Sequence, residues 1–151
     1  MPAWEHNNFR TWQLPGYYVG AWRRATGTLS ESDYDATFPG PVARQDAVAE
    51  LFQDCSGPGQ RVFVWGTVHW AYALSDRLPA ARYVSLNTAY SLDPRSERVL
   101  VQDLATHPPA VLVAAMDPPP GLLAWLEDRH YARAVGDVAG YPYWSAPGVS
   151  C

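Results

Sequence analysis

The sequence predicts one α/β domain over residues 41–151, preceded by a helical extension over residues 1–40. Three observations support this fold class. Residues 61–86 read as a strand, a short helix and a second strand, a βαβ unit whose strands run parallel. Residues 110–116 form a continuous apolar run, typical of a strand covered on both faces. Segments with helical spacing of apolar residues separate these strands. We therefore expect a small Rossmann-like three-layer sandwich with a mostly parallel sheet and a C-terminal hairpin.

The N-terminal part is strongly aromatic. Residues 3–25 interleave Trp and Tyr with Arg, and Pro15-Gly16 divides the stretch into two pieces. The second piece, 17–25, is predicted to be a helix that ends at Gly27 and whose last-turn arginines favour the helix dipole. This composition fits a membrane-interface belt. It equally fits aromatic side chains that cover the core of a small domain, and both interpretations stay open at this point.

Two further helices are expected before the first strand. Ser30, followed by acidic residues, predicts a short helix over residues 30–38. Pro41 occupies the permitted first position of a stronger helix over residues 41–55. The three-and-four spacing in that helix predicts a buried stripe of Val48, Leu51, Phe52 and Cys55.

The central βαβ unit is predicted in detail. A β-branched and aromatic run over residues 61–65 is expected to be a strand with a tight exit at Gly66. A short helix over residues 69–77 follows and stops at Pro79, since proline lacks the N–H donor. Residues 82–86 are expected to form the second strand.

The rest of the chain is predicted to add two helices, one buried strand and a hairpin. Leu122, Leu123 and Leu126 are expected to point inward. The predicted segments are a polar loop at 87–94, a helix at 97–106, a strand at 110–116, a helix at 121–129, and strands at 131–138 and 141–145 joined by a turn at Ala139-Gly140.

Composition and charge exclude several classes of protein. The formal net charge of −4 argues against a nucleic-acid binder, which needs a basic surface to release counterions. No apolar run reaches the length of about 18 residues that a membrane span needs, and no signal peptide is recognised. No zinc-ligand spacing occurs, so we expect no metal or cofactor. A bridge between Cys55 and Cys151 is possible outside the cytoplasm, although nothing in the sequence requires it.

A candidate ligand site lies where the predicted parallel strands end, because open sheets bind ligands beyond the carboxyl ends of their strands. His69 and Trp70 follow the first strand, Asn87 and Tyr90 follow the second, and Asp117 follows the third. This polar and aromatic rim would suit a sugar, with Trp70 stacking and Asn87 or Asp117 accepting hydroxyl hydrogen bonds. The alternative is structural: Asp117 caps the next helix and Asn87 belongs to a turn.

No catalytic set is identified. The first strand leaves without the glycine pattern of a dinucleotide site, and the chain has no phosphate-binding loop, nucleophile elbow or zinc-protease motif. The four histidines are scattered at unrelated places.

Four pieces of the sequence occur in an order that matches a known family over roughly residues 17–145. The matching positions are Gly27, Ser30 and Tyr34; Val64, Trp65 and Gly66; Tyr72, Leu74, Ser75, Arg77, Pro79, Arg82 and Tyr83; and Pro108 and Pro109. They resemble the soluble C-terminal domain of GT-C type membrane glycosyltransferases, the relatives of dolichyl-phosphate-mannose protein mannosyltransferases.

The resemblance implies a role without catalysis. Enzymes of this family move a sugar from a polyprenyl-phosphate donor on the outer face of the membrane. Their catalytic acid lies in a loop between the first transmembrane helices, and the resemblance matches no residue of this chain to that loop. The resemblance therefore implies an extracytoplasmic domain, inactive alone, that assists acceptor recognition or covers the active-site mouth. Its partner would be the transmembrane part of the same polypeptide, and residues 1–40 would be the post-membrane segment.

Two arginines of the matching segment, Arg77 and Arg82, allow two interpretations. Their guanidinium groups could tie a helix to loop carbonyls, or they could bind an anion such as a lipid phosphate.

Two other functions remain as alternatives to the glycosyltransferase domain. One is an independent carbohydrate-binding module that uses Trp70, Asn87 and Asp117. The other is a small enzyme or ligand-binding α/β domain with a cleft at the strand edge.

Overall fold

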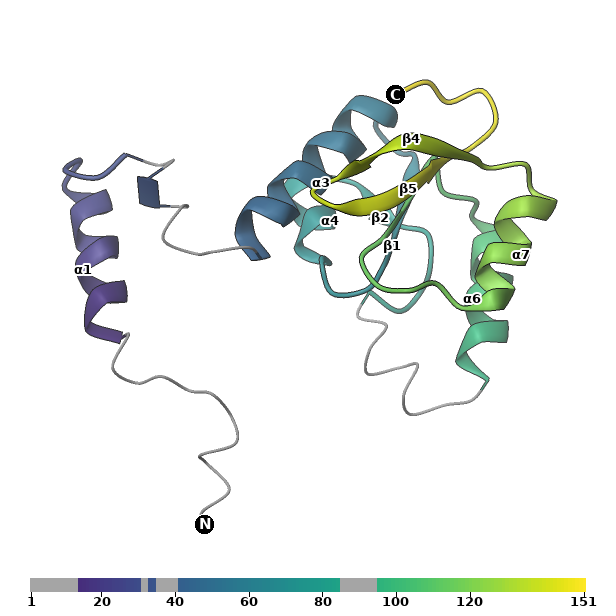
Figure 1. Cartoon of the computed structure of the whole chain (residues 1–151), viewed down its shortest axis with the longest axis horizontal. Coiled ribbons are helices and arrows are strands. Elements are labelled where there is room, and N and C mark those ends of the chain that lie inside the picture. Colours follow the sequence, from purple (N-terminus) through teal and green to yellow (C-terminus); the bar gives the residue numbers. More distant parts are fainter. Residues whose placement is uncertain (1–13, 31–32, 35–40, 85–94) are drawn as a thin grey trace, which may run out of the picture. The chain divides into compact units, whose positions relative to one another are not determined.

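The computed structural model describes residues 14–30, 33–34, 41–84 and 95–151 (Figure 1). The chain separates into two compact units, Met1–Ala43 and Arg44–Cys151, and each is considered by itself. In the part of the chain that the structure describes, no helix is both long enough and apolar enough to cross a membrane.

The first unit contains α1, Leu14–Ala25. The sequence analysis predicted that Pro15-Gly16 would divide this stretch, but the helix runs through both residues. Pro15 is tolerated because a proline in the first turn removes no intrahelical hydrogen bond. The helix ends as predicted at Gly27, whose φ of 71° is left-handed. The Thr28 N–H donates to the carbonyl of Arg23 at 2.9 Å.

Ser30 acts as the predicted helix cap. Its Oγ accepts a hydrogen bond from the N–H of Asp33 at 3.1 Å, and residues 33–34 are helical. The other residues predicted for that helix, at 31–32 and 35–38, lie outside the described residues.

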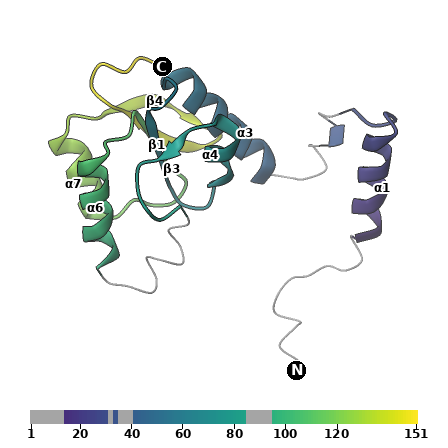
Figure 2. The ribbon, with the colours of Figure 1, turned by 180° about the vertical axis from the view of Figure 1, so that it is seen from behind.

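The second unit is built on a mixed five-stranded sheet in the order β2-β1-β3-β5-β4 (Figures 1 and 2). This confirms the α/β class and the C-terminal hairpin. A Rossmann-like, mostly parallel sheet is not confirmed, since two of the four pairings between the described strands are antiparallel. The reason is the hairpin: its two-residue turn makes β4 and β5 antiparallel, and β5 also pairs antiparallel with β3. The strands are β1 (Arg61–Trp65), β2 (Leu78–Pro79), β3 (Val111–Ala114), β4 (Ala132–Val138) and β5 (Tyr141–Ser145).

The second strand of the central unit lies earlier than predicted. Residues 82–84 are not in a strand, and residues 85–86 lie outside the described residues. Instead β2 pairs with β1, and the Ala80 N–H donates to the carbonyl of Val62 at 2.9 Å. Helix α4 (Trp70–Ser75) ends early because Asp76 is left-handed, with φ 55°. The chain therefore returns to the sheet sooner, and Pro79 is tolerated because β2 is an edge strand.

Helices cover both faces of the sheet (Figures 1 and 2). Alternate residues of β1 enter opposite cores: Val62 and Val64 pack with α3 (Pro41–Cys55) and α4, whereas Phe63 and Trp65 pack with α6 (Ser96–Thr106) and α7 (Pro120–Asp128). The same alternation in β3 confirms the prediction of a strand buried on both faces.

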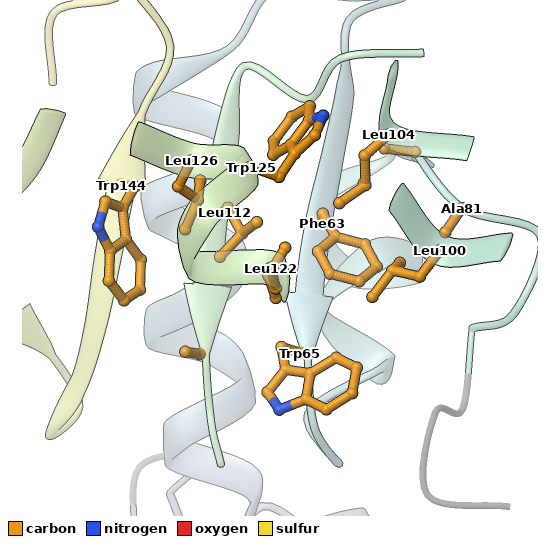
Figure 3. Close-up of a cluster of buried hydrophobic side chains, with 12 residues drawn as sticks. Phe63, Trp65, Ala81, Leu100, Leu104, Leu112, Leu122, Trp125, Leu126 and Trp144 are labelled. Carbon is orange, nitrogen blue, oxygen red and sulfur yellow. The ribbon is translucent and has the colours of Figure 1, made fainter. Parts of the chain in front are cut away.

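Figure 3 shows the core formed with α6 and α7, in which Leu122, Trp125 and Leu126 of α7 lie over the sheet. Leu122 and Leu126 point inward as predicted. The prediction was wrong for Leu123, which is 38% exposed. Position 123 lies one residue, about 100°, around the helix from Leu122, so it turns away from a sheet that Leu122 and Leu126 already face.

A disulfide joins Cys55, at the end of α3, to Cys151, with 4.7 Å between their Cα atoms. Cys55 is buried, as its place in the predicted stripe indicated, together with Val48 and Phe52; Leu51 is half-buried. The sequence left the pairing open. The bridge closes 96 residues of sequence and so encloses nearly the whole second unit.

Candidate functional site

The loops after β1 and β3 leave the sheet on the same side, at the carboxyl ends of these parallel strands, as the sequence predicted. This side is called the carboxyl edge. Trp65 lies opposite Ala114 in the parallel register, and the Ala115 N–H donates to the carbonyl of Trp65 at 2.8 Å. The two loops are in close contact at Gly66, where a Cβ atom would stand 2.9 Å from the Cβ of Ala115. Gly66 has a φ of 134°, which L side chains rarely adopt. A glycine is therefore needed at this point of the edge.

His69 and Trp70 form the aromatic part of this edge. The Trp70 side chain is 62% exposed, and its ring lies beside the His69 ring, with centroids 6.4 Å apart and planes at 28°. The backbone N–H of Trp70 donates to Oε1 of Gln45 at 2.9 Å, which ties the start of α4 to α3. The Nδ1 atom of His69 is buried without a hydrogen-bond partner among the described residues. The indole is thus a flat apolar surface at the anchored start of α4.

Asp117 is exposed on the neighbouring loop. Its carbonyl oxygen accepts a hydrogen bond from Nε1 of Trp65 at 3.0 Å, so its backbone helps to hold the edge together. The alternative interpretation, that Asp117 caps the next helix, is wrong: the residue before α7 is Pro119, and the N–H of Gly121 in the first turn of α7 donates instead to Oε1 of Glu97 at 2.8 Å. Asn87 and Tyr90, the other predicted rim residues, lie outside the described residues.

Arg77 has the structural role that the sequence suggested. Its guanidinium donates through Nη2 to the carbonyl of Ser56 at 2.9 Å and through Nη1 to the carbonyl of Ser75 at 3.0 Å. Its Nε donates to the Ser56 hydroxyl at 3.0 Å. Arg77 thereby joins the end of α4 to the loop that follows α3.

Arg82 has a different partner from the predicted loop carbonyls. Its Nη2 lies 2.6 Å from Oδ1 of Asp103 on α6, its Nε 2.9 Å from Oδ2, and its backbone N–H donates to Oδ2 at 3.0 Å. Hydrogen bonding by Arg82 holds the pKa of the Asp103 carboxyl below its usual value. The predictions missed Asp103. Its place beside Leu100 and Leu104, on the buried stripe of the helix, was a signal that could have found it.

This pair lines an open hollow of about 360 Å³ together with Arg61 and His107. The hollow lies where β1 begins, at the opposite end of the strand from the predicted rim, and its floor includes Pro79. Arg61 is held there because its Nη1 donates to the carbonyl of Pro79 at 2.6 Å. Three basic side chains and the carboxylate of Asp103, which Arg82 already binds, thus line the same hollow.

No group of three or more His, Cys, Asp or Glu side chains among the described residues is arranged to hold a metal ion.

Several of the residues on which the expected family resemblance was based make internal contacts. The Val64 N–H donates to the hydroxyl of Tyr72 at 2.7 Å, and the Tyr131 hydroxyl donates to the carbonyl of Pro109 at 2.6 Å. In the first unit, the Tyr34 ring lies over Gly20 of α1. These contacts stabilise the fold, whereas Leu74 and Tyr83 of the same set are exposed. The predicted rim residues do not belong to this set.

Comparison with family models, curated proteins and solved structures finds no match to this chain. The fold and the site together describe a mixed α/β domain with an aromatic rim at the carboxyl edge of its parallel strands.

Proposed function

We propose that this chain is the non-catalytic extracytoplasmic domain of a polyprenyl-phosphate-sugar-dependent membrane glycosyltransferase, and that it assists recognition of the acceptor. The observation that carries the proposal is the exposed Trp70 indole beside His69, at the start of α4, whose backbone Gln45 anchors to α3. An exposed aromatic face can stack on the apolar face of a sugar ring, and an anchored backbone lowers the conformational entropy that binding costs.

The disulfide supports the extracytoplasmic location. The cytosol keeps protein thiols reduced, whereas disulfides persist in oxidising compartments. The Cys55–Cys151 bridge joins a buried cysteine of the core to the last residue of the sequence. A domain that carries such a bridge suits the outer face of a membrane, where the family resemblance also places it.

The residues that carry the resemblance support a domain whose catalysis depends on another part of the polypeptide. These positions, such as Tyr72, Arg77 and Trp65, are engaged in contacts of the fold. The catalytic acid that the family uses belongs to its transmembrane part. In this proposal the domain provides a stable platform, and Trp70 presents the acceptor to the active site.

The proposal is tested in the full-length enzyme, with its transmembrane part, by Trp70→Ala. Loss of one aromatic stacking contact of about 0.5–1.5 kcal/mol should raise the acceptor KM roughly twofold to tenfold. The donor KM should stay unchanged, because the donor is bound elsewhere. Leu74→Ala is the matched control, since Leu74 is also exposed on α4, at 50%. If Trp70→Ala behaves like Leu74→Ala, the proposed role in acceptor recognition is wrong.

An independent carbohydrate-binding module is the second candidate, and the same exposed indole favours it. The two functions differ in what the isolated chain does. Titration with oligosaccharides, followed by tryptophan fluorescence, should show no saturable binding if the domain acts only within the transferase. Saturable binding that Trp70→Ala abolishes would favour the module. Sugar transfer or hydrolysis by the purified chain would contradict both.

A further inference from the structure

Helix α1 carries a stripe of exposed apolar side chains. Tyr18 is 67% exposed, Val19 55% and Trp22 66%. At about 100° per residue these three positions fall within about 100° of the helix circumference, so they form one face. Large apolar residues scattered singly over a surface are common, but three on one side of a twelve-residue helix form a contiguous patch.

The opposite side of α1 is covered within the same unit. The Tyr34 ring lies 3.7 Å from the position that a Cβ on Gly20 would take, and Gly20 is roughly opposite Trp22 on the helix. Tyr34 is held there because its N–H donates to the carbonyl of Ser30 at 2.9 Å. Among the described residues of the first unit, Tyr34 thus packs on the side of α1 opposite to the aromatic stripe. The local packing favours the interface interpretation over the core interpretation.

The charges of α1 are all of one sign. Arg23 and Arg24 occupy its last turn, and residues 14–25 contain no Asp or Glu. Arg23 lies about 40° around the helix from Val19, beside the stripe, whereas Arg24 lies on the other side. An amphipathic helix with Trp and Tyr on one side, Arg23 beside them and no acidic residue is suited to the headgroup region of an anionic bilayer. There the aromatic rings sit at the headgroup level and the long Arg23 side chain reaches the phosphates.

We infer that α1 lies on the surface of an anionic lipid bilayer, with Tyr18, Val19 and Trp22 inserted at the boundary between headgroups and acyl chains. The helix has twelve residues, about 18 Å in length, which suits a position in the plane of the surface, since a span needs about 20 residues. This inference rests on α1 alone and does not depend on the proposed acceptor role of Trp70.

Cosedimentation of the full chain with lipid vesicles tests the inference. One set of vesicles contains phosphatidylcholine alone, and the other contains phosphatidylcholine mixed with phosphatidylglycerol. We expect clear binding to the mixed vesicles and much weaker binding to the neutral ones. Arg23→Gln should weaken binding to the mixed vesicles about fivefold, because one arginine near an anionic surface contributes about 1 kcal/mol. Arg98→Gln, an exposed arginine of α6, should have no effect.

The aromatic stripe is tested with Tyr18→Ala/Trp22→Ala, which should reduce binding to both vesicle types. Trp70→Ala, which removes an exposed tryptophan of the second unit, is the control and should bind as the wild type does. Alanine favours helix formation, and circular dichroism checks that the helix content is kept. Absence of binding to the mixed vesicles would overturn the inference. That result is expected if the stripe is covered by another protein surface. Equal loss in the Trp70 and Tyr18/Trp22 variants would overturn it too.

Discussion

The hydroxyl of Tyr72 in α4 accepts a hydrogen bond from the backbone N–H of Val64 in β1, at a distance of 2.7 Å. Val64 lies two residues after Val62, whose carbonyl faces β2, so the Val64 N–H points to the same side. Strand β2 ends at Pro79, which pairs with Val62, and therefore leaves Val64 without a strand partner. Tyr72 supplies the missing acceptor, which a buried N–H requires.

Tyr72→Phe should destabilise the domain by about 1–3 kcal/mol, because it leaves the buried Val64 N–H without an acceptor. Urea denaturation followed by circular dichroism measures this change. Tyr83→Phe is the matched control and should be close to neutral, since Tyr83 is 43% exposed. Equal stability of the two variants would show that water replaces the tyrosine hydroxyl.

Stability should fall at alkaline pH through the buried tyrosines. Burial raises the pKa of Tyr131 to about 12 and that of Tyr72 above its usual value. The unfolded chain releases these protons near pH 10. The stabilising contribution is therefore complete below about pH 10 and is lost as the pH rises toward the folded-state pKa.

The measurement is the free energy of unfolding as a function of pH on the alkaline side. Tyr131→Phe should reduce the slope, because one of the groups that titrate is gone. An unchanged slope in Tyr131→Phe would contradict the role assigned to burial. Tyr143→Phe, at a half-buried tyrosine of β5, provides a comparison within the same sheet.

The Arg82–Asp103 pair should make the domain sensitive to acid. Because Arg82 lowers the pKa of Asp103 in the folded state, the pair contributes stability above the unfolded pKa of about 3.9 and loses it as the pH falls through the folded value. Asp103→Asn should lower stability at neutral pH and flatten the acid limb of the pH profile. Asp54→Asn, at an exposed position of α3, should leave that limb unchanged. If Asp103→Asn leaves the loss of stability at low pH unchanged, that loss arises from other carboxylates.

Gly66→Ala should destabilise the sheet edge by roughly 1–3 kcal/mol, because alanine is strained at this φ and its Cβ would collide with Ala115. Thermal unfolding measures the loss. Gly136→Ala in β4 is the matched control, since no atom lies within 4 Å of its Cβ position. If both variants unfold at the same temperature, the two loops can separate without cost.

Removing the disulfide by Cys55→Ala/Cys151→Ala should lower the free energy of unfolding by about 2–5 kcal/mol, because the bridge closes a long loop and restricts the unfolded chain. A reductant should destabilise the wild type by a similar amount. The double variant is the control for the reductant, which should not affect it. A wild type that the reductant leaves unchanged would mean that the bridge adds no stability.

Local patterns in the sequence determined most of the elements. The helix Pro41–Cys55 and the strands Arg61–Trp65 and Tyr141–Ser145 have the predicted bounds. Their spacing and end signals involve residues close in sequence. The predicted turn at Ala139-Gly140 is also present, with φ values of 51° and 81°, as a two-residue hairpin turn requires.

The candidate site was predicted only in part. The sequence placed His69, Trp70 and Asp117 at the strand edge, since the order of strands and loops implies it. It could not show that Trp70 is exposed while Trp65 is buried, because exposure depends on which elements pack against each ring. The acceptor role of the rim stays a prediction.

The sequence by itself determined the α/β class, most of the described helices and strands and the glycine turns, because these depend on interactions between near neighbours in the chain. Tertiary structure alone decided the pairing of Arg82 with Asp103, the bridge from Cys55 to Cys151 and the place of β2. Each of these depends on groups that are brought together only when the helices pack on the sheet, and many alternative partners are compatible with the same local pattern.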